Sequence, residues 1–353
     1  MEIKELLLRE IGKFKNNKII FSNYHVSTDN MNKHNQPIFY SKKGNLYEKT
    51  NILMSNIRPY FNKVWYSDRT GSKSSNVLCF VVTNNNVLSK YAYYLICSDK
   101  FNNFWSKTSK GTTMPVGDKE AILNFKFKIC DKANQQAIIN IIEPFEKMEC
   151  KYKAKIDYIL KIGDFKILNI FSTKYFLKDF FNVEIGQTPS TKNKSYWKDG
   201  ENFWINSGAL TNNLVLLNAT NKITQNAVKS KNLKKSNKYS TFISIMEPSI
   251  NKISLSGISS YFNQSIANIE PINKNDYGFI FFELRRNIYK LSSLSTGTAQ
   301  KSINKSDLLN FKINRPIDDN LLFFKLSKLL INHHNIIFHC KKIINLITSL
   351  LII

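Results

Sequence analysis

Two short polar segments of this chain have related sequences and carry groups that can bind a polyanion. They span residues 109–113 and 296–301, and each holds a Gly-Thr pair among Ser, Thr, Lys or Gln side chains. Hydroxyl, ammonium and free backbone N–H groups bind nucleic-acid phosphates, and glycine lets the backbone approach a ligand closely. A duplicated structural turn before a helix fits the same pattern. The candidate contact residues are Ser109, Lys110, Gly111, Thr112, Thr113, Thr296, Gly297, Thr298, Gln300 and Lys301.

Arginine is scarce in this chain, so the arginine that precedes Pro59 is a second candidate for a base contact. Arg or Lys can pair with guanine, and Asn or Gln with adenine, when loops carry them into the major groove of DNA. The corresponding positions in the later part of the chain are Glu247 and Ser249, and such a difference is expected where side chains select a sequence. We expect DNA contacts from Arg58, Tyr60, Lys63 and Lys252.

A third polar run covers residues 186–193 and suits either a contact loop or a plain surface turn. Asn263 and Gln264 could read adenine or could instead satisfy backbone groups at a strand end. The nearby aromatic residues Phe203, Trp197 and Trp204 fit a core better than a base-stacking role. The predicted DNA contacts of this group, with two further lysines, are Thr188, Ser190, Thr191, Lys192, Asn193, Lys119 and Lys305.

No motif for catalysis is present in the sequence. It contains no phosphate-binding loop that ends in Gly-Lys-Ser/Thr, no dinucleotide-type glycine fingerprint and no Asn- or Asp-Pro-Pro-aromatic methylation motif. His333, His334 and His339 lack metal-ligand spacing. The five cysteines include no Cys-x-x-Cys pair and are interpreted as buried free thiols in a reducing compartment. We expect no catalytic residue and no metal site in this chain.

The charge balance favours a polyanionic partner. The 353 residues include 51 Lys and Arg against 26 Asp and Glu, a net charge of +25. The densest basic stretch, 229–238, could follow phosphates or be a solvated connection. The apolar stretch 343–353 is shorter than the roughly 20 residues of a membrane span, and the charged N-terminus does not resemble a signal peptide. We therefore expect a soluble cytoplasmic protein without membrane contact.

The sequence repeats itself. Residues 111–126 align without a gap to residues 297–312, at an offset of 186, and both segments end in Leu-Asn-Phe-Lys. Residues 52–64 align to residues 241–253 at an offset of 189. Two matches in the same order and at nearly the same spacing predict a tandem of two related units.

A long apolar pattern follows each repeated segment. In 134–162 and in 320–350, apolar residues recur at alternating three- and four-residue steps, which is the spacing of a coiled-coil seam. Two amphipathic helices, each packed on its own domain, would give the same pattern. Because proline disfavours a helix interior, we expect a break before Pro144. The predicted seam positions are Ile138, Ile141, Phe145, Met148, Tyr152, Ile159, Ile162, Leu322, Leu326, Leu329, Ile336, Cys340, Ile343, Ile347 and Leu350.

Outside these helices, apolar runs such as 76–82, 18–21 and 239–245 predict strands, and 89–103 predicts a packed helix. The fold class is therefore α+β, repeated, with two strand-rich domains separated by two long, antiparallel coiled-coil-like helices. The expected bounds are 1–133 for the first domain, 134–162 for a spacer helix, 163–319 for the second domain and 320–353 for the C-terminal helix.

Taken in order, these motifs resemble the specificity subunit of type I restriction-modification systems. The resemblance covers most of the chain and rests on Gly186-Gln-Thr-Pro-Ser-Thr191, Phe203-Trp-Ile-Asn-Ser-Gly208, Met246-Glu-Pro-Ser-Ile-Asn-Lys252 and Ser295-Thr-Gly-Thr-Ala-Gln300, with Ile57-Arg-Pro-Tyr60 and Ser109-Lys-Gly-Thr-Thr-Met-Pro115 in the first unit. The opening of the first unit, 23–31, differs from 186–190. The two units should therefore read different half-sites.

The resemblance implies two target-recognition domains that each read one half of a split double-stranded DNA site, with the helices setting the separation. It also implies a chain without a catalytic centre. Modification subunits would bring S-adenosylmethionine and adenine methylation, and a motor-nuclease restriction subunit would bring ATP, Mg and cleavage. The alternatives are a protein–protein scaffold with incidental charge and a stand-alone methyltransferase or nuclease.

Overall fold

The computed structural model describes residues 3–15, 18–31, 40–169, 172–219, 221–297, 301–316 and 320–350. The chain forms two compact units. Unit 1 consists of residues 1–148 and 339–353, and unit 2 of residues 149–338. Each unit is a mixture of helices and small sheets, which confirms the predicted α+β class.

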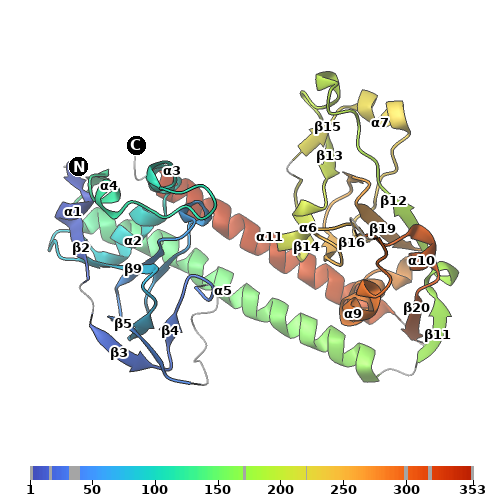
Figure 1. Cartoon of the computed structure of the whole chain (residues 1–353), viewed down its shortest axis with the longest axis horizontal. Coiled ribbons are helices and arrows are strands. Elements are labelled where there is room, and N and C mark those ends of the chain that lie inside the picture. Colours follow the sequence, from blue (N-terminus) through green and yellow to red (C-terminus); the bar gives the residue numbers. More distant parts are fainter. Residues whose placement is uncertain are drawn as a thin grey trace. The chain divides into compact units, whose positions relative to one another are not determined.

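Unit 1 is built on a four-stranded antiparallel sheet (Figure 1). Four successive residues at the start of β9 are buried, so this apolar strand has a central place in the sheet. The strand orders are β2 (Gly12–Phe14), β9 (Val77–Val82), β6 (Ile52–Ser55) and β7 (Val64–Tyr66) in the main sheet, β3 (Ile19–Ser22), β5 (Lys42–Tyr47), β8 (Gly71–Lys73) and β4 (His25–Val26) in a second sheet, and β1 (Lys4–Leu7) with β10 (Lys126–Ile129) in a pair.

Unit 2 repeats this plan with one additional strand in the main sheet. The strand orders are β12 (Phe181–Ile185), β19 (Ile266–Pro271), β16 (Thr241–Ser244), β17 (Ile253–Ser256) and β14 (Val215–Leu216) in the main sheet, β15 (Asn221–Ile223), β13 (Asn202–Ile205) and β18 (Tyr261–Phe262) in a second sheet, and β11 (Ser172–Phe176) with β20 (Lys312–Pro316) in a pair. The order β12-β19-β16-β17 reproduces β2-β9-β6-β7, and all neighbours in both sets are antiparallel. The predicted tandem is therefore visible in the sheet topology.

Short helices pack against these sheets. The predicted helix 89–103 is two helices, because Ser98 ends the first and its hydroxyl accepts a hydrogen bond from the Phe101 N–H to cap the second. The short helices are α1 (Leu8–Ile11), α2 (Ser89–Cys97), α3 (Asp99–Thr108) and α4 (Lys119–Leu123) in unit 1, and α6 (Gly208–Asn212), α7 (Gln225–Lys231), α8 (Phe279–Arg286), α9 (Ile288–Ser292) and α10 (Lys305–Leu309) in unit 2.

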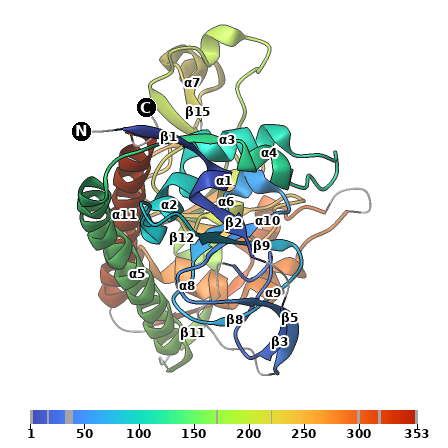
Figure 2. The same cartoon turned by 90° about the vertical axis from the view of Figure 1, so that its left-hand side faces the viewer.

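Two long helices, α5 (Lys132–Asn169) and α11 (Leu321–Leu350), contribute to both units (Figure 2). In unit 1, Ile139 from the early part of α5 belongs to the core against which Ile347 from the late part of α11 packs. In unit 2, Tyr152 from α5 meets His333 from α11 edge-to-face, with ring centroids 4.9 Å apart. The two helices run in opposite directions, as predicted.

The break expected before Pro144 is wrong, because α5 continues through it. Pro144 removes the hydrogen bond that would reach the carbonyl of Asn140. Both residues are exposed, so water can solvate this carbonyl. Packing on either side, by Ile142 in unit 1 and Ile156 in unit 2, then holds the helix as one element.

The predicted seam is also partly wrong. On α5, Ile141, Met148 and Ile162 are exposed, whereas the buried positions are Ile139, Ile142, Ile156, Ile159 and Ile167. On α11, Leu322, Leu329 and Leu350 are exposed, whereas Phe323, Leu326, Leu330, Ile331, Ile337 and Cys340 are buried. The buried faces of the two helices pack on the sheets and small helices of each unit, and also on each other. A strict two-helix seam does not describe that arrangement.

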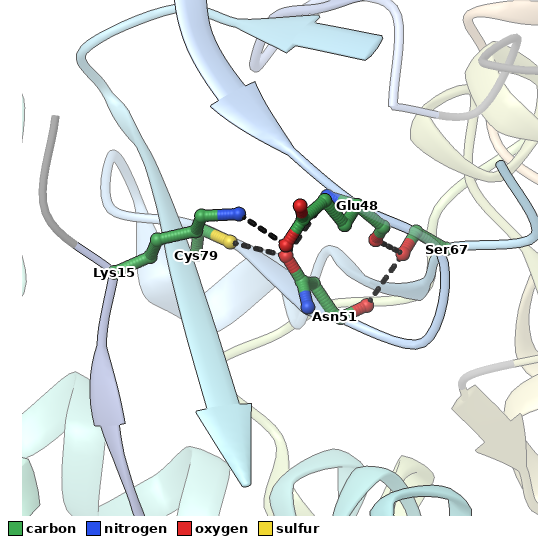
Figure 3. Close-up of polar contacts among 5 residues, drawn as sticks. All are labelled: Lys15, Glu48, Asn51, Ser67 and Cys79. Carbon is green, nitrogen blue, oxygen red and sulfur yellow. Dashed lines mark hydrogen bonds and ion pairs between the residues drawn. The ribbon is translucent and has the colours of Figure 1, made fainter. Parts of the chain in front are cut away.

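The turn that leads into β6 is fixed by a polar network (Figure 3). Asn51 is its centre, since its side-chain oxygen accepts hydrogen bonds from the Glu48 N–H at 2.9 Å and from the Cys79 thiol at 3.3 Å. The Ser67 hydroxyl donates to the Asn51 carbonyl at 3.0 Å, and the Lys15 ammonium pairs with the Glu48 carboxylate at 2.5 Å. These contacts hold the start of β6, and the candidate Arg58 follows the other end of this strand.

The cysteine prediction holds only in part. Cys79, Cys130 and Cys340 are buried, whereas Cys150 is exposed and Cys97 is half-buried. Burial raises the pKa of the Cys79 thiol to about 11. Among the described residues, no helix is both long enough and apolar enough to cross a membrane.

Candidate nucleic-acid interface

The two segments of unit 1 singled out by sequence lie side by side. Lys110 and Val116 exchange both backbone hydrogen bonds, at 2.9 and 2.8 Å, so 110–116 is a closed loop. Val116 also bridges to Ile57, and the Arg58 N–H donates to the Pro115 carbonyl at 2.8 Å. We call 57–63 together with 109–117 the paired loops of unit 1.

Unit 2 contains the same pair of loops. Thr296 and Ser302 exchange both backbone hydrogen bonds at 2.9 Å, and Ser302 bridges to Met246. The Glu247 N–H donates to the Lys301 carbonyl at 3.2 Å. Each of these contacts matches one in unit 1 at the offsets of 186 and 189 residues found in the sequence. The paired loops of unit 2 are 246–252 with 295–303.

Glycine is required in both closed loops. Gly111 has a φ of 98° and Gly297 a φ of 116°, a backbone region that other residues rarely adopt. The expectation that these glycines let the backbone approach a ligand closely stays a prediction. In the described part of the chain they also lie on exposed loops, where a ligand could approach the backbone.

The chain matches the family model for the type I restriction modification DNA specificity domain twice, over residues 2–158 and 172–320. The two matches cover most of the 353 residues. The chain belongs to this family of DNA specificity domains.

A solved structure has the same fold. A type I restriction-modification S subunit from M. genitalium matches with a TM-score of 0.58 at 12% identity, covering 99% of this chain and 94% of that one. An HsdS subunit from Thermoanaerobacter tengcongensis has a TM-score of 0.36 at 12% identity, covering 99% and 95% of the two chains.

In the first specificity domain, most predicted contact residues are exposed. Lys63 and Ser109 are the exceptions. Lys63 is half-buried, and its ammonium donates to the carbonyl of Thr28 at 2.8 Å and lies 5.9 Å from the Phe61 ring centroid. Ser109 is half-buried and its hydroxyl donates to the Ser106 carbonyl at 2.6 Å. Both side chains therefore have a structural role. The exposed residues are Arg58, Tyr60, Lys110, Gly111, Thr112, Thr113 and Lys119.

Asp118 joins the closed loop of the first domain to the helix that follows it. Its carboxylate accepts hydrogen bonds from the N–H groups of Glu120 and Ala121, both at 3.1 Å, and so caps α4. The Lys110 ammonium lies 2.8 Å from the same carboxylate. The Lys110 hydrogen bond, and then the one from Ala121, lowers the pKa of Asp118. Lys110 is therefore paired with the capping carboxylate, while 82% of its side chain is exposed to solvent.

In the second domain, the predicted contact lysines Lys252 and Lys301 of the paired loops are exposed, and so is Lys305 just beyond them. Lys305 begins α10 and lies 3.7 Å from the Glu184 carboxylate. Thr296 and Gly297 are exposed. Thr298 and Gln300 lie outside the described residues.

The polar run 186–193 lies against the end of β18. The Gln187 N–H donates to the Phe262 carbonyl at 2.9 Å, and the side chains of Thr188 and Gln264 form a hydrogen bond. The segment that follows β18 also contacts the residue just before the paired loops. There the Ile245 N–H donates to the Ser265 carbonyl at 2.9 Å. The start of the polar run and the strand before the paired loops are therefore both held against the segment 262–265. The exposed members of the run are Gln187, Ser190, Thr191, Lys192 and Asn193.

Sequence reasoning missed two lysines next to that run. Lys194 and Lys198 line an open groove of about 620 Å³ together with Trp197 and Trp204. The two indole rings meet edge-to-face at 5.0 Å, and Trp204 is buried, which confirms its interpretation as core. The repeat with the first domain does not extend to this segment, so the sequence comparison carried no signal for it.

Among the residues that the structure describes, no three His, Cys, Asp or Glu side chains are grouped so that they could hold a metal ion. His333 packs against Tyr152, and burial, followed by the charge of Lys155, lowers its pKa. The neighbouring His334 Nδ1 lies 2.9 Å from the Leu330 carbonyl. These two histidines belong to the helix packing of unit 2.

Proposed function

We propose that this chain is the DNA-recognition subunit of a type I restriction-modification complex and reads a two-part, asymmetric duplex sequence. The observation that carries the proposal is the pair of loops that recurs in both specificity domains. The backbone contacts are the same, but Arg58 stands where the second domain has Glu247. A shared scaffold with different exposed side chains suits two domains that each select a different half-site.

The recognition function requires favourable electrostatics, which the net charge of +25 provides. A protein that neutralises several phosphates loses affinity steeply as salt rises. The predicted contact residues of both domains, including Lys110 and Lys305, would supply the positive charges that neutralise phosphates. We further propose domain bounds of 1–133 and 163–319, with α5 and α11 as the connecting helices.

The chain is proposed to act without a catalytic centre of its own. Modification subunits, with S-adenosylmethionine, would methylate the site, and a restriction subunit with ATP would cleave. The modification subunits are proposed to bind exposed apolar side chains of the long helices. Those on α5 and α11 in unit 1 are Ile141, Met148, Leu346 and Leu350, and those in unit 2 are Tyr158, Ile162, Leu168, Leu322 and Leu329.

The test is an electrophoretic mobility shift with the purified complex on duplexes that carry the site found by genomic methylation mapping. We expect binding that depends on both half-sites and falls steeply with salt. Equal binding to all duplexes with no salt dependence would exclude the proposal. Methylation by the isolated chain with only cofactor added would favour a catalytic function, and partner binding without DNA affinity would favour a scaffold.

A separate experiment tests the role of the helices. Seven residues inserted after Glu149 lengthen α5 by two turns, about 10 Å. We expect the preferred gap between half-sites to change while both half-sites stay the same. A seven-residue insertion at the exposed Asn85 serves as the control and should leave the gap unchanged. Loss of both half-site preferences together would show that the helices are not spacers.

A further inference from the structure

The paired loops of unit 1 expose an unusual group of apolar side chains. Tyr60 is 50% exposed, Phe61 57% and Met114 53%, and the neighbouring Val116 is 39% exposed. The rings of Tyr60 and Phe61 lie 4.6 Å apart, centroid to centroid. We call these four residues the apolar tip. Large apolar groups gathered in water mark a surface that another molecule covers.

The backbone around the aromatic pair of the apolar tip has a strained conformation and is fixed to the domain. Tyr60 and Phe61 belong to the short helix η1 (Pro59–Phe61), and the residues on both sides of it have left-handed backbone, with φ values of 50° at Arg58 and 46° at Asn62. The Asn62 side chain also donates to the Cys97 carbonyl at 2.9 Å. Left-handed backbone at two non-glycine residues is costly, and such strain is typical of functional loops.

The second domain lacks an apolar tip although its loops have the same backbone contacts. Ser249 stands in place of Tyr60 and is 6% exposed, and Ile250 stands in place of Phe61 and packs against the core of unit 2. Ser302 stands in place of Val116. The exposed aromatic pair is therefore not a requirement of the paired-loop fold.

The surroundings of the apolar tip are cationic. Arg58 is exposed and directly precedes η1. Lys110 faces Val116 across the closed loop, and its side chain is 82% exposed although its ammonium pairs with Asp118. An apolar centre with positive charge beside it complements a ligand that has an apolar stacked interior between two anionic strands. Duplex DNA has that chemistry, and apolar side chains of DNA-binding proteins enter between base steps and kink the duplex.

We propose that the apolar tip enters a base step of the half-site read by the first domain and unstacks and kinks the duplex there, an action for which the described residues of the second domain have no equivalent. The inference rests on the proposed function and adds a difference in mechanism between the two domains. Part of the selectivity of the first domain then comes from how easily a step unstacks, which favours flexible pyrimidine–purine steps.

The test compares the full chain in its complex with the double variant Tyr60→Ser, Phe61→Ser, in which serine replaces Tyr60 as it does in the second domain. Permanganate oxidises unstacked thymines, so the probe is the recognised duplex with thymines placed at successive steps of each half-site. We expect a reactive thymine in one half-site that loses its reactivity in the variant, with at least tenfold weaker binding. A circular-permutation assay should show a smaller bend.

Two controls separate the possible results. Tyr289→Ser removes another aromatic side chain, 86% exposed on α9, and should leave reactivity and affinity unchanged. Tyr60→Phe with Phe61→Leu keeps the apolar bulk and should retain both. Specific binding with no reactivity that depends on these two residues would overturn the inference but not the proposed function. Loss of the complex between the chain and its partner subunits without DNA would instead assign the apolar tip to a protein partner.

Discussion

The backbone N–H of Arg58 is bonded to the carbonyl of Pro115, two residues that are far apart in the sequence but lie on facing loops. The same bond joins Glu247 to Lys301 in the second domain. Because this contact uses only backbone atoms, it forms with either Arg or Glu at the first position, although the Glu247 carboxylate also accepts a 3.4 Å hydrogen bond from the Lys301 N–H. This arrangement separates the scaffold of the paired loops from the side chains proposed to select DNA.

Arg58→Ala should weaken specific binding and relax the preference at one half-site only. An arginine bound to guanine contributes about 1–3 kcal/mol to discrimination, so the expected loss is roughly 10- to 100-fold. Competition binding with duplexes mutated in either half-site measures the effect. The matched control is Arg9→Ala, which removes an exposed arginine on α1 and should leave both preferences intact. Equal weakening on all duplexes would indicate a phosphate contact instead.

The two helix starts that follow the closed loops should respond differently to alanine. Asp118 caps α4 through two backbone hydrogen bonds, whereas Asn304, at the same place before α10, makes no side-chain cap. Asp118→Ala should therefore lower the thermal midpoint, and Asn304→Ala should change it much less. Thermal unfolding followed by circular dichroism compares them. Similar losses in both variants would show that the cap is not what matters at Asp118.

Unit 1 should lose stability as pH falls below about 6.5, the ordinary pKa of histidine. Burial, and then the charge of Lys42, lowers the pKa of His25, whose Nδ1 lies 2.8 Å from the Ser72 hydroxyl and whose Nε2 is buried without a partner in the described structure. The unfolded chain then binds a proton before the folded one does, so stability is fully present above pH 6.5 and is lost as pH falls toward the folded pKa.

Urea unfolding at several pH values tests this expectation. His25→Gln removes the titration and should flatten the dependence between pH 7 and pH 5 relative to the unmodified chain. His339→Gln, at an exposed histidine on α11, is the matched control for replacing a histidine by glutamine. A slope that is the same with and without His25 would assign the pH dependence to other groups.

The repeat made much of this fold predictable. The offsets of 186 and 189 residues placed the paired loops in equivalent positions, and the structure gives them matching backbone hydrogen bonds. Periodicity was less informative for the long helices. Apolar residues occur on both the buried and the exposed faces of α5, as Ile142 and Ile141 show, so spacing alone could not identify the face that packs.

The candidate site was predictable to a similar extent. Residue type could not reveal that Lys63 is held by the Thr28 carbonyl, because those residues meet only in the folded domain. Lys194 and Lys198 were missed for a related reason. They line a groove whose wall is made by residues brought together by the second sheet of unit 2, and the first domain has no repeated segment to compare with it.

Cys150 provides a direct test of partner binding to α5. It is exposed and lies two residues from the exposed Met148, whereas Cys79 is buried with its pKa raised to about 11. In the isolated chain, alkylation by iodoacetamide should therefore modify Cys150 rapidly and Cys79 only after unfolding. Addition of the modification subunits should slow the reaction of Cys150 at least tenfold, as measured by mass spectrometry of tryptic peptides. DNA alone should not protect it, and unchanged reactivity in the assembled complex would place the partner on another surface.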